Sequence, residues 1–100
     1  MSAFDWSVMS YTSGRIYGGQ KTGITTSAVQ IVASADDKAI REALIQSDPA
    51  NTTNVLVGNV DAQYVVLTPG QSVTIPVISL TRVYVKMSSG TGSVNWLSRD

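Results

Sequence analysis

Residues 54–97 read NVLVGNVDAQYVVLTPGQSVTIPVISLTRVYVKMSSGTGSVNWL, a series of short apolar stretches separated by turn-forming residues. Within a stretch, apolar side chains recur at every second position, as in Val73, Ile75 and Val77. Because successive side chains of a β-strand point to opposite faces, this pattern predicts strands with one apolar and one polar face. Two sheets of such strands bury their apolar faces against each other, so the sequence predicts an all-β fold.

The number and spacing of the strands define the expected domain, residues 27–100. We expect strands at residues 29–33, 41–46, 53–58, 64–67, 72–77, 82–87 and 93–97. About seven short strands with regular turns are typical of a small antiparallel β-sandwich or a jelly-roll-like barrel. In the 82–87 strand, Val83 and Val85 should face inward together with Val94, while the alternate side chains face out.

Two local signals refine this prediction. Thr68-Pro69-Gly70-Gln71 places Pro and Gly at the central positions of a type II turn. Pro76 lacks a backbone donor, so its strand should lie at a sheet edge or bulge there. Residues 34–46 are ambiguous, since an apolar stripe with Ser34 as N-cap also fits a helix. We favour a strand from Arg41 to Gln46, with Asp36–Lys38 as the turn before it.

Residues 1–26 differ from the rest of the chain. They are rich in Ser, Thr, Gly and Tyr, show little alternation, and contain four of the seven aromatic residues: Phe4, Trp6, Tyr11 and Tyr17. Disordered tails are usually poor in aromatics. We therefore interpret residues 1–26 as an extended N-terminal arm that places its rings in pockets of another subunit. The alternative is an arm that folds back over its own domain.

Composition argues against catalysis. Among 100 residues there is no Cys and no His, which removes thiolate sites, the commonest general base and the commonest metal ligand. A Ser or Thr activated by Lys remains conceivable, but no motif surrounds Lys21, Lys38 or Lys86. Asp48 and nearby Asn residues match no calcium loop and are better explained as turn residues. We expect a protein that is not an enzyme and needs no cofactor or metal.

Charge points to protein partners. Seven basic and seven acidic residues cancel, so no net field attracts nucleic acid or an anionic membrane. No apolar run approaches the ~20 residues that span a bilayer. A surface of hydroxyls with zero net charge is poorly protected against association. We expect binding to protein, including further copies of the chain, with Arg82, Tyr84 and Lys86 on the outer face of an interface strand.

Several short sequence motifs occur in the same order as in a known group of proteins. They are Leu44-Ile45-Gln46-Ser47, the Asn-Thr-Thr turn of residues 51–54, Val55–Asn59, Leu67–Val77 and Val83–Leu97. From Val32 to Leu97 the chain resembles small β-sandwich virion proteins of tailed bacteriophages, many of them described as head decoration or minor structural proteins. The resemblance covers about two thirds of the chain, excludes the arm, and implies no catalytic residue.

Such domains occur on capsids, necks and tails, so the resemblance implies a virion structural protein, and the role that we favour is that of a capsid decoration or cement protein. Such a protein is in the host cytoplasm during assembly, binds the major capsid protein on the outer surface of the virion, and fastens the shell. One alternative is a neck, tail or fibre-base module that binds another virion protein. A second alternative is a carbohydrate-binding sandwich that uses Tyr64, Tyr84 or Trp96 as a stacking platform, although Trp96 is in phase with Val94 and fits the core better.

Overall fold

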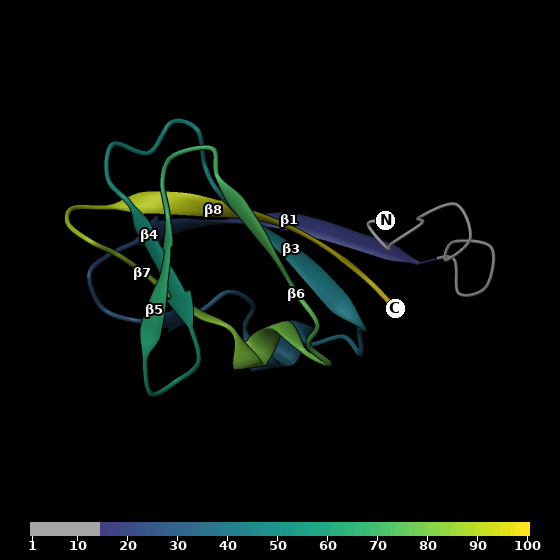
Figure 1. The fold of residues 1–100 in the computed structure, drawn as a ribbon. Coiled ribbons are helices and arrows are strands. Elements are labelled where there is room, and N and C mark those ends of the chain that lie inside the picture. Colours follow the sequence, from purple (N-terminus) through teal and green to yellow (C-terminus); the bar gives the residue numbers. More distant parts are fainter. Residues whose placement is uncertain (1–14) are drawn as a thin grey trace.

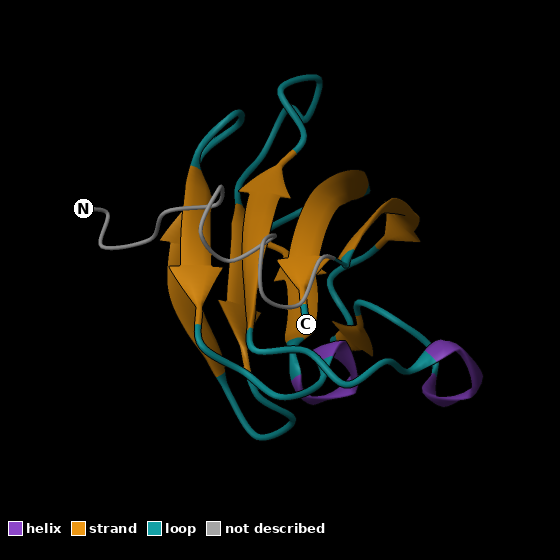
Figure 2. Cartoon of the chain, turned by 90° about the vertical axis from the view of Figure 1, so that its right-hand side faces the viewer, coloured by secondary structure: helices purple, strands orange, loops and turns teal. Residues whose placement is uncertain are grey.

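The computed structural model describes residues 15–100, which form a sandwich of two four-stranded antiparallel sheets (Figure 1). The strands are β1 (Ile16–Ile24), β2 (Val29–Gln30), β3 (Glu42–Ser47), β4 (Val55–Gly58), β5 (Gln63–Leu67), β6 (Ser72–Ile75), β7 (Tyr84–Met87) and β8 (Gly92–Arg99). Two short 3-10 helices, η1 (Ser34–Asp36) and η2 (Leu80–Arg82), lie apart from each other at the same end of the sandwich (Figure 2).

The strand order is that of a jelly roll. One sheet has the order β1-β8-β3-β6 and the other β2-β7-β4-β5. The antiparallel pairs β1–β8, β2–β7, β3–β6 and β4–β5 are those of one long hairpin. The pairs β3–β8 and β4–β7 join the rolled hairpin into two sheets. Eight strands arranged in this way form a double-sheet jelly roll, which confirms the predicted sandwich class with one strand more than expected.

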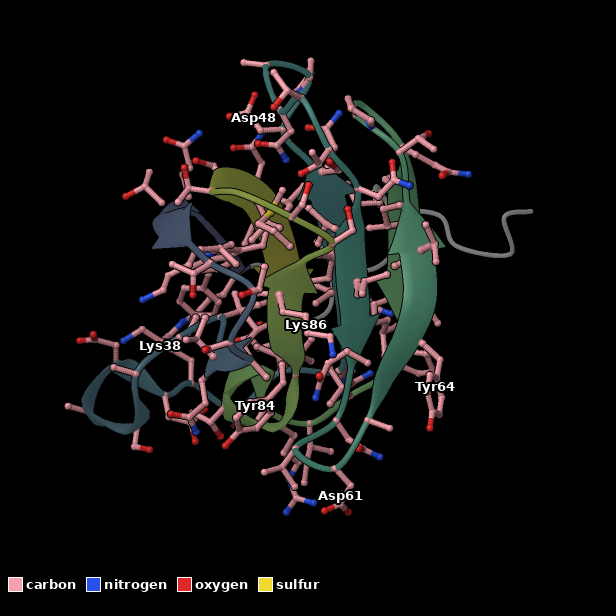
Figure 3. All side chains as sticks on the ribbon, turned by 90° about the vertical axis from the view of Figure 1, so that its left-hand side faces the viewer. Lys38, Asp48, Asp61, Tyr64, Tyr84 and Lys86 are labelled. Carbon is pink, nitrogen blue, oxygen red and sulfur yellow. The ribbon has the colours of Figure 1, made fainter. Side chains whose placement is uncertain are left out.

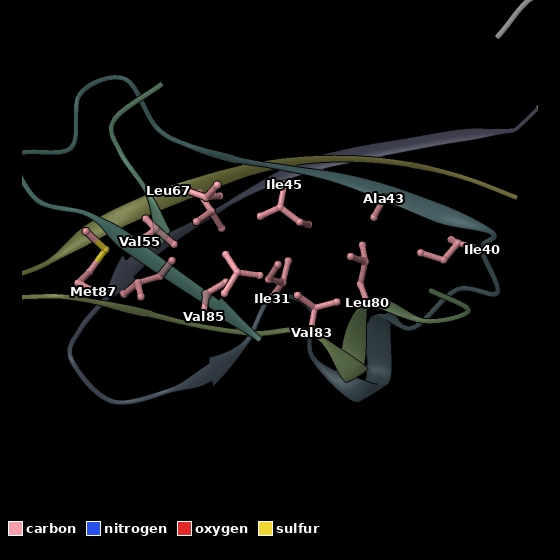
Figure 4. Close-up of a cluster of buried hydrophobic side chains, with 13 residues drawn as sticks. Ile31, Ile40, Ala43, Ile45, Val55, Leu67, Leu80, Val83, Val85 and Met87 are labelled. Carbon is pink, nitrogen blue, oxygen red and sulfur yellow. The ribbon is translucent and has the colours of Figure 1, made fainter. Parts of the chain in front are cut away.

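The core lies between the two sheets and is aliphatic (Figure 4). Val55, Val85 and Val94 are fully buried, and Val83 is only 4% exposed. The predicted inward face of the last two strands is thereby confirmed. The ring of Trp96 packs against the same cluster, so its role is core packing rather than a stacking platform.

Several local predictions are also confirmed. The ambiguous segment contains the strand β3, and helical structure is confined to the single turn of η1. Gly70 has φ +86°, and the backbone N–H of Gln71 donates to the carbonyl of Thr68 at 2.9 Å, as a type II turn requires. The strand before Pro76 is an edge strand and ends at Ile75.

The expected division between an arm and a domain at residue 27 is wrong for the described part of the arm. Residues 16–24 are the strand β1, which pairs with β8 from Ile16–Arg99 to Ile24–Gly92. Ile24 is fully buried in the core. The amide of Gln20 donates to Asn95 at 3.0 Å and to Asp48 at 2.8 Å, which ties β1 to its neighbours. β1 therefore belongs to the sandwich.

Four strands are shorter than predicted: β2, β4, β6 and β7. β2 ends at Gln30, where residues 29–33 were expected. The strand expected over residues 82–87 begins at Tyr84, because Arg82 lies in η2. The hydroxyl of Ser79 accepts a hydrogen bond from the backbone N–H of Thr81 at 3.2 Å and caps this helix.

The side-chain amide of Asn51 forms hydrogen bonds with the backbone of β8, as a peptide group of a neighbouring strand would. Its amide nitrogen donates to the carbonyl of Ser93 at 2.8 Å and to the hydroxyl of Ser47 at 3.0 Å. Its oxygen accepts from the backbone N–H of Ser93 at 2.9 Å. These three bonds hold the 48–54 loop against the end of the sandwich, where Ser47 is fully buried.

We expect Asn51→Asp to lower the free energy of unfolding by about 1–3 kcal/mol. The carboxylate can still accept from Ser93, but it cannot donate to Ser93 and Ser47, which then lose a partner. Chemical denaturation measures the difference. Asn54→Asp is the matched control, since the Asn54 side chain makes no hydrogen bond within residues 15–100. Equal losses in the two variants would contradict this role of Asn51.

Candidate interaction surfaces

Of the four aromatic residues assigned to the arm, the structure places one. Phe4, Trp6 and Tyr11 lie outside the described residues. Tyr17 lies in β1 opposite Ser98 and packs against the core, so it belongs to the domain and not to an arm. The ammonium of Lys38 lies 5.7 Å from the centre of its ring, a cation–π contact. A hydrogen bond with Tyr17 raises the pKa of the exposed Arg15 guanidinium, with a smaller contribution from Asp100.

Tyr17 also lines a pocket of about 500 Å³ beside β1. Trp96, Ile40 and Leu80 contribute apolar surface to its lining, which also includes Lys38. The Ser98 hydroxyl, buried in the wall, has no hydrogen-bond partner among the described residues. The volume is within the range of small-ligand sites. Besides the hydroxyls of Tyr17 and Ser98, the lining contains the charged side chains of Asp36 and Lys38.

Arg82, Tyr84 and Lys86 do not form one row on a strand, contrary to the expectation from sequence. Tyr84 and Lys86 are half-buried on the outer face of β7, where their cross-strand neighbours on β4 are Gly58 and Leu56. Figure 3 shows both side chains on this face. Arg82 lies in η2 and is exposed beside a different feature, a groove between the two sheets.

The strongest exposed apolar feature among residues 15–100 is β5, which was not among the predicted interface residues. Tyr64 is 86% exposed, Val65 49% and Val66 48%. Figure 3 shows Tyr64 projecting from the outer side of the molecule, away from Tyr84 and Lys86. The signal in the sequence was the run Tyr64–Leu67, four apolar residues without the alternation of a half-buried strand.

The groove beside β5 has a volume of about 230 Å³. Val57 and Val65 line it from one sheet, and Val73, Ile75 and Val77 line it from the other side. Arg82 is the charged residue in its lining. An apolar groove next to an exposed apolar strand is a surface suited to contact with another protein chain.

The oxygen-bearing residues considered for calcium serve turns. The carboxylate of Asp48 accepts from the backbone N–H of Ala50 at 3.0 Å. The side-chain oxygen of Asn59 accepts hydrogen bonds from the backbone N–H groups of Asp61 at 2.9 Å and Ala62 at 3.0 Å. These are Asx-turn hydrogen bonds, in agreement with the turn interpretation. Within residues 15–100 no three acidic side chains gather as a metal site would require.

Comparison with known proteins gives no assignment, since no family model, curated protein or solved structure matches the chain. None of the helices in residues 15–100 is long and apolar enough to cross a membrane.

Proposed function

We propose that the chain is a non-enzymatic structural protein of a tailed-bacteriophage virion, and that it decorates and stabilises the capsid. The observation that carries this proposal is the exposed, uncharged strand β5 with Tyr64 86% exposed. An aromatic side chain held out on a rigid strand buries a large area at low entropic cost when a partner covers it. A decoration protein requires such a surface.

The resemblance of residues 32–97 to phage virion proteins supports the same role. The sequence motifs that carry the resemblance lie on β3, β4, β6, β7 and β8 and on the turns between them. Jelly rolls occur in viral capsids, although the fold also serves lectins, so the fold itself assigns no function. The partner is the major capsid protein on the outer surface of the shell, and neck or tail proteins remain the alternative partner.

The mechanism is reversible docking onto the assembled lattice. A protein that binds the assembled shell better than free subunits stabilises the shell by RT ln(1 + [L]/Kd) per site. With zero net charge and an apolar contact strand, binding should depend only weakly on salt.

We expect capsids stripped of this protein to melt at a lower temperature than capsids to which it has been restored, at both low and high salt. Calorimetry of the two preparations measures the difference. Tyr64→Asp should restore less stability than the native chain, whereas Thr74→Asp, on the outer face of the opposite sheet, should restore the full effect. No gain on restoring the native chain would exclude capsid stabilisation and favour a neck or tail position.

A further inference from the structure

The sandwich is open along the side where β5 and β6 are the edges of their sheets. Val65 is paired with the buried Val57 and therefore faces inward, yet it is 49% exposed. Its inward-facing neighbours on β5, Gln63 and Leu67, are 8% and 2% exposed. The apolar groove of about 230 Å³ lies at this point. A half-exposed inward valine above an apolar groove indicates that the core lacks a cover here.

β5 is also the edge strand with the least protection against pairing. Natural edge strands are kept from pairing by shortness, charge, proline or irregular geometry. β2 has two residues, β1 contains Lys21, and Pro76 directly follows β6. β5 has five residues, Gln63–Leu67, with neither charge nor proline, and like β1 it has one register irregularity, next to Gly58 of β4. It can accept an added strand on its free side.

The sequence contains a segment with the matching pattern. Residues 4–8 read FDWSV, in which Phe4, Trp6 and Val8 alternate with Asp5 and Ser7. These residues precede the first described residue, Arg15. As an added strand, the segment would direct its three apolar side chains to one face and its two polar side chains to the other. That matches an apolar groove on one side of β5 and solvent on the other.

The position of β1 favours a neighbouring copy as the acceptor. β1 and β5 lie at opposite lateral edges of the two sheets. The path around the sandwich from β1 to β5 is roughly 24 Å, from three strand spacings and one sheet spacing. The chain from Val8 to Arg15 spans at most roughly 25 Å. Binding to the groove of its own copy would need a taut tether, whereas a copy placed beside β1 needs none.

We propose that residues Phe4–Val8 of one copy bind as an added strand along β5 of the next copy, with Phe4, Trp6 and Val8 covering the groove. The donor and acceptor are at opposite edges, so the contact is head-to-tail and closes into a ring when the rotation between copies permits. The proposal concerns contact between copies and does not depend on binding to a capsid.

The absence of Cys from the chain allows a cross-linking test on the full-length protein. One preparation carries Ser7→Cys and the other carries Tyr64→Cys. In the native chain Tyr64 lies on the solvent face of β5 and is 86% exposed. The two are mixed and treated with a short bis-maleimide. We expect a product that joins the two different chains. Ser7→Cys mixed with Thr22→Cys, at an exposed position of β1, is the matched control and should give far less product.

A second substitution tests the apolar anchor. Trp6→Asp, added to the Ser7→Cys chain, should weaken association by roughly thirtyfold or more, the size expected for loss of a buried aromatic anchor. Sedimentation of each variant measures association, and thermal melting verifies that each is folded. Preferential cross-linking to Thr22→Cys would place the segment on β1 and overturn the proposal. A folded native chain that stays monomeric and yields no product between copies would also overturn it.

Discussion

A chain that lacks residues 2–26 is expected to be unfolded or aggregated, whereas a chain that lacks residues 2–14 is expected to fold. The longer deletion removes β1, which pairs with β8 along seven residue positions. It also removes the fully buried Ile24 from the core. Truncating one buried isoleucine to alanine already costs about 2–5 kcal/mol, against a total stability of about 5–15 kcal/mol.

Loss of β1 also has a consequence for the edge of the sheet. β8 would become an edge strand, and its backbone groups that now pair with residues 16–24 would be exposed. Such an edge pairs readily with other chains, so aggregation should accompany the loss of stability.

Circular dichroism and thermal melting distinguish the two deletions. The shorter one leaves every residue of the described sandwich in place and should melt cooperatively, within a few degrees of the native chain. If the proposed contact between copies is correct, it should also be monomeric. A cooperative transition at the native temperature in the longer deletion would show that β1 is dispensable.

The sequence predicted those strands in which side-chain alternation coincides with burial. β3, β4, β6 and β7 each place aliphatic residues at alternate positions toward the core, β8 places Val94 and Trp96 there, and each of these strands was located to within three residues. The order of the strands could not be obtained in this way, because pairs such as Ile16–Arg99 join residues far apart in the chain.

β1 was missed for a physical reason. Its inward positions hold Tyr17, Gly19 and Lys21, opposite Ser98, Trp96 and Val94 on β8. A Cβ at Gly19 would lie 2.8 Å from the ring of Trp96, so the ring fills the space that an aliphatic side chain usually occupies. The core beside β1 is therefore filled partly by a side chain of β8, and the sequence of β1 does not show alternating apolar residues.

The expectation that Arg82 lies on the outer face of a strand was wrong. The alternation of residues 82–87 suggested one strand face, but the hydroxyl of Ser79 caps a helical turn that includes Arg82. The apolar run of β5 was visible in the sequence, yet its exposure follows from its position at the edge of the sheet, which only the topology reveals.

Val85→Asp is expected to unfold the protein at neutral pH, whereas Lys86→Asp is expected to be tolerated. Val85 is fully buried in β7 between Val29 of β2 and Val57 of β4. A carboxylate there has no partner, and an unpaired buried charge costs several kcal/mol, comparable to the whole stability of a small domain. Lys86 lies on the outer face of the same strand, where a carboxylate keeps contact with water.

The pH dependence of the stability of the Val85→Asp variant provides a sharper test of whether position 85 is buried. Desolvation raises the pKa of the introduced carboxyl in the folded state above the unfolded value of about 3.9. Folding then takes up a proton, so the difference in stability between variant and native chain is smallest below about pH 4 and grows as pH rises toward the folded pKa. Denaturation at several pH values measures this difference. A difference that does not change with pH would mean that the carboxyl reaches water, and that the register placing Val85 in the core is wrong.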